Sequence, residues 1–200
     1  MTQLAVKVDI DSLRGYREGV PKMLDLFKKH GIKASIFFSF GPDNSGKAIR
    51  RIFRKGFISK MMRTKAPSTY GIKTLLYGTL LPAPMIVPSD PGILVRAVEE
   101  GHDCGVHAWD HVYVQDELAR ISKEEFRSLF ERSADMFEKL SGRKPMSCAA
   151  PGWQISQVSL EVQQELGLNY CSDTRGRKPF LPVFGGRSYT PVQIPTTLPT

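Results

Sequence analysis

Short apolar segments alternate with helical patterns along most of this chain, and this alternation limits the folds that it can adopt. Strand-like segments are predicted at 4–8, 32–40, 103–106, 146–150 and 169–172. Helical patterns are predicted at about 18–30, 91–100, 122–141 and 156–166. Glycines stand where three of these helices should end, at Gly31, Gly101 and Gly142. Strands and helices that alternate with short links predict an α/β fold with a parallel sheet or a barrel.

Length and composition place the chain among ordinary globular proteins. Its 200 residues can form one domain of common size. The sequence contains no run of 18 apolar residues, which a helix would need to cross a bilayer. The segment MTQLAVKVDID at the start has no cleavable apolar stretch. The chain has three cysteines, Cys104, Cys148 and Cys171, and no CxxC pair. This odd number favours free thiols in a reducing compartment. We therefore expect a cytoplasmic protein.

Positive charge is concentrated in one part of the chain, a basic insert at about 44–90. No acidic residue lies between Asp43 and Asp90, whereas this span holds nine lysines and arginines. The net charge of the whole chain is +8, so the remainder is close to neutral. Isoleucine, phenylalanine and methionine accompany the basic residues, a mixture that suits a helix lying in an anionic membrane surface. The side chains expected to face the membrane are Arg50, Arg51, Arg54, Lys55, Lys60 and Arg63.

Two other interpretations of the basic insert are open. It can be a solvated basic face over an ordinary core, or it can bind another acidic partner such as nucleic acid. No recognised nucleic-acid-binding module accompanies it, so nucleic acid is not the expected partner. The apolar segment 75–88 that follows is too short to span a membrane.

Acidic and histidine side chains gather where predicted strands end, which is where parallel α/β folds place functional groups. Asp9 and Asp11 follow the first strand, and they point to the same side if the strand continues that far. His107 and His111 follow the strand at 103–106, and they meet on one face if this segment is helical. Two further loops, AAPGW (149–153) and SDTRG (172–176), also follow predicted strands.

Each of these features also has a purely structural interpretation. The two aspartates can cap a loop, His102 suits a structural role, and an HxxxH spacing alone is a weak signal. Asp173 and Arg175 can pair in a turn, and the two tryptophans, Trp109 and Trp153, can be core aromatics. Taken together, however, two carboxylates and two histidines at successive strand ends fit a site that holds a divalent metal ion and leaves positions open for water.

The segments VDID, EEGHDCGVHAWDH and PGW resemble motifs of the polysaccharide deacetylase (NodB-homology) family. The resemblance implies a distorted (β/α) barrel with fewer than eight strands, formed by one domain over 1–200 and incomplete at its C-terminus. It implies one divalent metal ion (zinc, cobalt, manganese or nickel) bound by Asp11, His107 and His111, with Asp9 as general base. The two aspartates can also exchange roles, because Ile10 separates residues that are adjacent in the family. Contacts to the substrate or its oxyanion are expected from Gly152, Trp153, Asp173 and Arg175.

Longer segments narrow the resemblance within the family. VDIDSLRGYREGVP, ASIFFSFGPDNSGK, SDTRG and QIPTTLP resemble members that hydrolyse the N-formyl group of an aminoarabinose carried on undecaprenyl phosphate. This implies an amide hydrolase of lipid A modification and polymyxin resistance, peripheral on the cytosolic face of the bacterial inner membrane. Two alternatives remain open. One is a deacetylase of another N-acyl sugar, and the other is a catalytically impaired remnant that binds membrane or lipid-linked sugar.

Two departures from the family pattern bear on activity. The family has an arginine before the proline of its third motif that orients the base, and Ala149 and Ala150 stand there in this chain. Arg14 or Arg175 are candidates to replace it. The family also draws a catalytic histidine from a motif near the C-terminus, whereas no histidine follows His111 here. We therefore expect a truncated chain that can bind metal but has impaired activity.

Overall fold

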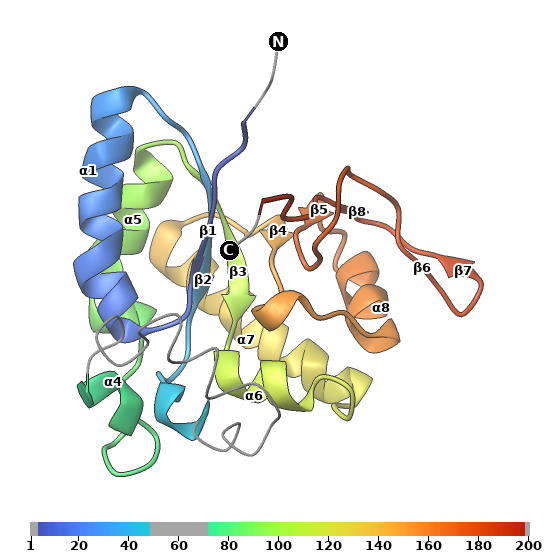
Figure 1. Ribbon diagram of the computed structural model, residues 1–200, viewed down its shortest axis with the longest axis horizontal. Helices are drawn as coiled ribbons and strands as arrows, with labels where there is room; N and C mark the ends of the chain where they lie inside the picture. The colour runs from blue at the N-terminus through green and yellow to red at the C-terminus, as the bar shows by residue number, and fades with distance from the viewer. Residues whose placement is uncertain (1–3, 49–71, 199–200) are drawn as a thin grey trace.

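Six parallel strands form one curled, open sheet in the computed structural model, which describes residues 4–48 and 72–198 (Figure 1). Their order across the sheet is β1-β2-β3-β4-β5-β8. The strands are β1 (Lys7–Ile10), β2 (Ser35–Ser39), β3 (Asp103–Ala108), β4 (Ser147–Cys148), β5 (Tyr170–Cys171) and β8 (Val192–Gln193). A separate antiparallel pair follows β5, formed by β6 (Val183–Phe184) and β7 (Arg187–Ser188). This architecture confirms the predicted α/β fold with an incomplete barrel.

Helices follow the strands in the predicted rhythm. They are α1 (Val20–His30), α4 (Ile72–Leu76), α5 (Pro91–Glu99), α6 (His111–Glu117), α7 (Lys123–Ser141) and α8 (Gln157–Glu165). A π-helical turn at Gly15–Gly19 leads into α1. Gly31 (φ 64°) and Gly142 (φ 71°) end α1 and α7 in the left-handed conformation that glycine adopts without steric cost, as predicted. Ser122 caps α7 by accepting a hydrogen bond from the Glu125 N–H.

The main hydrophobic core lies between the sheet and helices α1, α5 and α7. Ile36 and Phe38 of β2 are fully buried there, and the Phe38 ring meets the Tyr16 ring edge to face at 6.2 Å between centroids. The Tyr16 hydroxyl donates to the Asp90 carbonyl at 2.7 Å and accepts from the Leu94 N–H at 3.2 Å. These bonds join the turn after β1 to the start of α5, so the loop beyond β1 is held in a defined place.

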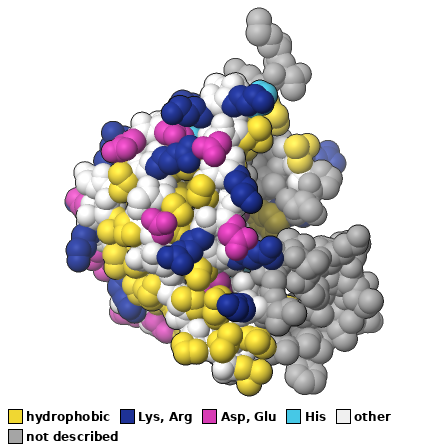
Figure 2. Space-filling view, turned by 90° about the vertical axis from the view of Figure 1, so that its left-hand side faces the viewer, with side chains coloured by type: hydrophobic (Ala, Val, Ile, Leu, Met, Phe, Trp, Pro, Cys, Tyr) yellow, Lys and Arg dark blue, Asp and Glu magenta, His cyan; other side chains and the backbone are white. Residues whose placement is uncertain are grey.

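Acidic and basic side chains are interspersed on the face that Figure 2 turns toward the viewer, the left-hand side of Figure 1 where α1 and α5 lie. Arg96 of α5, for example, pairs with Asp25 of α1 at 2.6 Å and with Glu100 at 2.9 Å. The mixture of opposite charges on this face agrees with the nearly zero net charge of the chain outside the basic insert. The six basic residues predicted to face a membrane, at 50–63, lie outside the described residues. No helix within the described part of the chain is long and apolar enough to cross a membrane.

The strand boundaries differ from the prediction at one functionally important place. The sequence predicts that the third strand ends at Val106, whereas β3 continues to Ala108 and therefore contains His107. Backbone pairing explains the extension, because the Phe40 N–H donates to the Ala108 carbonyl at 2.9 Å. Hydrophobic patterning predicts that the strand ends where polar residues begin, because it cannot detect a hydrogen bond to the neighbouring strand.

Gly105 permits the close approach of β3 to its neighbours. A Cβ there would lie 2.5 Å from the Ser147 carbonyl oxygen and 2.9 Å from a Phe37 ring carbon. We expect Gly105→Ala to lower the free energy of unfolding by about 1–3 kcal/mol through overpacking. Gly92→Ala in α5 is the matched control, since its nearest neighbour would be 3.5 Å away, and it should raise stability by about 0.4–1 kcal/mol. Urea unfolding followed by circular dichroism measures both, and effects of equal sign would contradict this account.

Candidate metal centre

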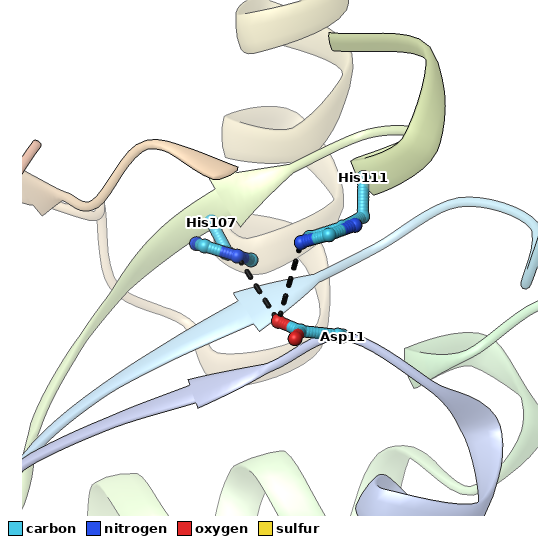
Figure 3. Close-up of side chains that lie close together, drawn as sticks. All are labelled: Asp11, His107 and His111. Atoms are coloured by element: carbon cyan, nitrogen blue, oxygen red, sulfur yellow. Dashed lines mark ion pairs between the residues drawn. The ribbon is translucent and has the colours of Figure 1, made fainter. Parts of the chain in front are cut away.

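Asp11, His107 and His111 converge at the carboxyl end of the sheet (Figure 3). Asp11 Oδ1 lies 3.1 Å from His107 Nε2 and 3.6 Å from His111 Nε2. The two imidazole centroids are 5.2 Å apart with an angle of 34° between the rings. Asp11 follows β1 directly, His107 belongs to β3 and His111 is the first residue of α6. Side chains from the end of β1, from β3 and from the start of α6 therefore meet at a single point.

The two histidines do not share a helix, which corrects the sequence interpretation of their spacing. His107 lies in the strand and His111 starts the helix after a two-residue turn. The register of β3 against β2 shifts at this point, because Phe38 pairs with Val106 whereas Ser39 pairs with Ala108. His107 is thus the extra residue of a β-bulge, a device that redirects a side chain at the end of a strand.

A hydrogen bond fixes the orientation of the His107 ring. Its Nδ1 lies 2.6 Å from the Ala149 carbonyl oxygen of the neighbouring segment after β4. A carbonyl accepts only, so Nδ1 carries the proton in this bond. In the neutral imidazole the lone pair is then on Nε2, which faces Asp11. Metal-binding histidines commonly donate their other ring N–H to a carbonyl or carboxylate in this way.

Two acceptor atoms therefore face each other unless a positive charge lies between them. The His107 side chain is 2% exposed, and Asp11 Oδ1 is buried without a hydrogen-bond partner among the described residues. Burial raises the pKa of Asp11, but the neighbouring His111 and His107 lower it by a larger amount. The pKa of Asp11 therefore lies well below its usual range. Burial lowers the pKa of His107, yet Asp11 raises it overall. Both directions favour an ionised carboxylate beside a positively charged group.

The donor set fits a divalent transition metal ion in chemistry and spacing. Two imidazole nitrogens and one carboxylate oxygen are typical ligands of zinc and related ions in sites that keep positions open. Ligand bonds of about 2.1 Å place neighbouring donor atoms about 3.0–3.4 Å apart, close to the observed 3.1 and 3.6 Å. Asp11 Oδ1, buried without a hydrogen bond among the described residues, is the atom that such an ion would bind.

The loop after β2, GPDNSG (41–46), forms hydrogen bonds both to the segment that carries Asp11 and to the segment that carries His111. Its sequence did not indicate this role. Asp43 is buried and accepts a hydrogen bond from the Leu13 N–H at 2.8 Å. Asn44 donates to Asp110 at 2.5 Å, and Asp110 caps the helix that His111 begins. Side chains from GPDNSG therefore hold the loops that carry two of the three ligand candidates.

Asp9 lies in β1 beside a cation that the sequence analysis missed. Lys7 Nζ is 3.1 Å from Asp9 Oδ2, and it also donates to the Ser172 carbonyl at 2.8 Å. The other carboxylate oxygen of Asp9 is buried and has no hydrogen-bond partner among the described residues. Residues two apart on a strand share a face, which is the one signal that could have linked Lys7 with Asp9. The structure thus places Lys7, on β1, in contact with the candidate base.

Of the other predicted site residues, Gly152 and Trp153 form a tight turn after β4, with φ of 65° and 54°. The Trp153 N–H donates to the Ala150 carbonyl at 3.3 Å, which engages one of the two amides proposed for an oxyanion. Arg175 stacks on the Trp153 ring at 5.2 Å. Asp173 does not pair with Arg175, the structural alternative that the sequence left open, because Asp173 is fully buried and bonded to two glutamines. The expected contact of Asp173 with substrate stays a prediction.

Two residues that the sequence left between structural and functional roles pack structurally. His102 is buried, accepts a hydrogen bond from the Ala34 N–H at 3.2 Å and contacts the Phe27 ring. Trp109 lies under the Arg132 guanidinium at 4.1 Å. Both belong to the frame around the site.

The chain belongs to the polysaccharide deacetylase family, whose model matches residues 14–171. Among curated relatives, it is 41% identical over its whole length to the probable 4-deoxy-4-formamido-L-arabinose-phosphoundecaprenol deformylase of Shewanella sediminis. It is 30% identical over 93% of its length to the corresponding protein of Wigglesworthia glossinidia brevipalpis. A crystal structure assigned to the polysaccharide deacetylases, from Mycobacterium smegmatis, superposes with a TM-score of 0.62 at 15% identity.

These matches cover unequal shares of the proteins compared. The chain spans 64% and 65% of the two curated relatives. The superposition covers 96% of this chain and 58% of the Mycobacterium smegmatis chain, and it supports the fold alone. The predicted family is therefore confirmed, and the comparisons leave the roles of single residues as predictions.

Removing one ligand candidate should remove one bound ion. We expect His107→Ala to hold one zinc ion per chain fewer than the unmodified protein after dialysis against excess Zn²⁺. His30→Ala is the matched control, because His30 is exposed at the end of α1 and should change nothing. Elemental mass spectrometry measures the ratio of zinc to protein. An unchanged zinc content in a folded His107→Ala protein would refute the assignment of this site.

Proposed function

We propose that this chain is a metal-dependent amide hydrolase that removes the N-formyl group from 4-deoxy-4-formamido-L-arabinose-phosphoundecaprenol. The observation that carries the proposal is the convergence of Asp11, His107 and His111 at the strand edge that also holds Asp9. Its substrate is inferred from the curated relatives, one of which shares 41% of its residues. In this proposal the reaction belongs to lipid A modification and thus to polymyxin resistance.

The residues divide the chemistry among them. When bound, a divalent ion would supply Lewis-acid polarisation of the formamide carbonyl, which is a poor electrophile by itself. Asp9 Oδ1, the buried oxygen without a partner, takes a proton from the attacking water as general base. Lys7 pairs with the other oxygen of Asp9 and orients this carboxylate. The water oxygen then forms a bond to the formyl carbon, the C–N bond breaks, and the proton taken from water passes to the leaving nitrogen, which releases formate and the free amino sugar.

A lipid-linked substrate requires that the site lie near a membrane surface. The described ends of the basic insert lie at the same end of the sheet as α6 (Figure 1). Gly46 N–H donates to the Tyr77 carbonyl at 3.0 Å, and Leu80 beyond it is 80% exposed. We propose that this part of the chain, together with the basic residues of 50–63, rests on the anionic cytosolic face of the inner membrane.

Loss of the base should abolish most of the activity without loss of metal. Asp9→Asn keeps the size of the side chain but removes its capacity to accept a proton, so formate release should fall by about 10²–10⁴-fold. Zinc content should stay unchanged. Asp25→Asn, in the exposed ion pair with Arg96, is the matched control and should retain full activity. Formate is measured in an enzyme-coupled assay with the lipid-linked formamido sugar in detergent, and equal rates in both variants would overturn the proposal.

The same assay separates the proposed activity from that of a deacetylase, the name that the matching family carries. The N-acetyl analogue of the lipid-linked sugar is offered at the same concentration, and acetate release is measured. We expect faster release of formate than of acetate. A preference for the acetyl group would replace deformylation by deacetylation while leaving the metal site intact.

Lys7 should act as a positioning residue for Asp9. Lys7→Met removes the cation, and we expect formate release to fall by about 10–100-fold, as is usual when a group that orients a reactive residue is lost. Lys7→Arg retains the charge and should restore most of the rate. Urea unfolding of both variants shows whether the fold is intact. A loss of activity in Lys7→Arg as large as in Lys7→Met would contradict a role that depends on charge.

A further inference from the structure

A second cluster of metal-binding side chains lies in the interior, between β4 and β5. Cys148 and Cys171 are register partners on these adjacent parallel strands, so their side chains point to the same face. Their Sγ atoms are 3.3 Å apart, and Asp173 Oδ1 lies 3.8 Å from Cys148 Sγ. All three residues are buried, and their three donor atoms lie within 4.8 Å of one another.

The carboxylate of this cluster is surrounded by neutral groups. Asp173 is 0% exposed, and Oδ2 accepts hydrogen bonds from Gln163 at 2.8 Å and Gln193 at 3.1 Å. Burial raises the pKa of Asp173 above its usual range, even though both glutamines lower it. A buried charge is costly unless it is paired or binds a metal ion. The cluster thus has the requirements of a cation site and holds no cationic side chain in direct contact with the carboxylate among the described residues.

We propose that Cys148, Cys171 and Asp173 form a second metal site, which takes a thiophilic divalent cation such as Zn²⁺. Two thiolates make the site soft, in contrast to the imidazoles and carboxylate of the first site. Zinc–sulfur bonds of about 2.3 Å in tetrahedral geometry place two sulfurs about 3.8 Å apart, and a sulfur and a carboxylate oxygen about 3.6 Å apart. The observed 3.3 and 3.8 Å differ from these separations by a few tenths of an ångström.

A neighbouring group offers a fourth ligand. Gln163 Nε2 lies 3.4 Å from Cys148 Sγ, whereas Gln163 Oε1 is buried without a hydrogen-bond partner among the described residues. A half-turn of this amide gives up the bond from Nε2 to Asp173 Oδ2, exchanges the two atoms and directs the oxygen toward the cluster. Cys148, Gln163 and Asp173 also line a cavity of about 30 Å³. That volume is enough for a water molecule.

Binding leaves the total charge of this cluster unchanged. Both cysteines are free thiols before the ion binds. Entry of one divalent ion expels these two protons to solvent, and two Zn–S bonds replace two S–H bonds. The total charge of ion and ligands therefore stays the same as that of the ionised carboxylate alone. The interior gains no net charge.

Cobalt(II) distinguishes the two sites by absorption. Thiolate ligands give Co²⁺ an intense near-ultraviolet charge-transfer band, which imidazole and carboxylate ligands do not give. We expect this band to persist in His107→Ala, which lacks the first site, and to reach a plateau there at one Co²⁺ per chain. It should vanish in Cys148→Ser and in Cys171→Ser. Cys104→Ser is the matched control, since Cys104 is a third buried thiol outside the cluster, and it should leave the band unchanged.

A measurement on the unmodified chain keeps the test valid if a serine variant fails to fold. Saturating Zn²⁺ should slow the reaction of two of the three thiols with a disulfide reagent by at least tenfold, and chelation should reverse this protection. Absence of both the band and the protection would overturn the proposal, as would a band of equal strength in folded Cys148→Ser. Detection of a Cys148–Cys171 disulfide in the purified chain by mass spectrometry would also overturn it.

Discussion

The hydrogen bond between His107 Nδ1 and the Ala149 carbonyl determines what the rest of the site can do. At 2.6 Å it ties the end of β3 to the segment after β4 and leaves Nε2 as the acceptor that faces Asp11. Without a positive charge between them, two lone pairs would oppose each other in the interior. The turn before His111 and the loop that holds Asp11 bring the other two side chains to this nitrogen, and Lys7 pairs with Asp9 beside them.

The sequence predicts the frame of this protein better than it predicts the site. Alternating patterns identify the strands and helices, and Gly31 and Gly142 mark helix ends because their backbone conformation is a local property. The metal ligand candidates were found as strand-end residues. Their mode of convergence was not, because a β-bulge is defined by the neighbouring strand, here by Ser39 pairing with Ala108. Local spacing alone suggested a helix.

Other features escaped prediction for the same physical reason. Contacts between residues distant in sequence depend on the register of the sheet, and no pattern along the chain encodes them. The bond from Lys7 to the Ser172 carbonyl joins residues 165 positions apart, and that from Leu13 to Asp43 spans 30. The two cysteines are 23 residues apart and meet only because β4 and β5 are paired. Cysteine counting correctly favoured free thiols, but could not place two of them in contact.

The bulge at His107 has a consequence for any attempt to rebuild this centre in another protein. Strand β3 uses one residue more than β2 over the same length, so that His107 turns toward Asp11 while Ala108 returns to the ladder. Copying the three side chains onto a regular parallel sheet would therefore misdirect one imidazole, whatever the spacing of the residues. A transplant must carry the extra residue and the acceptor carbonyl that receives it. The transferable unit is a defect in the backbone together with its partner strand.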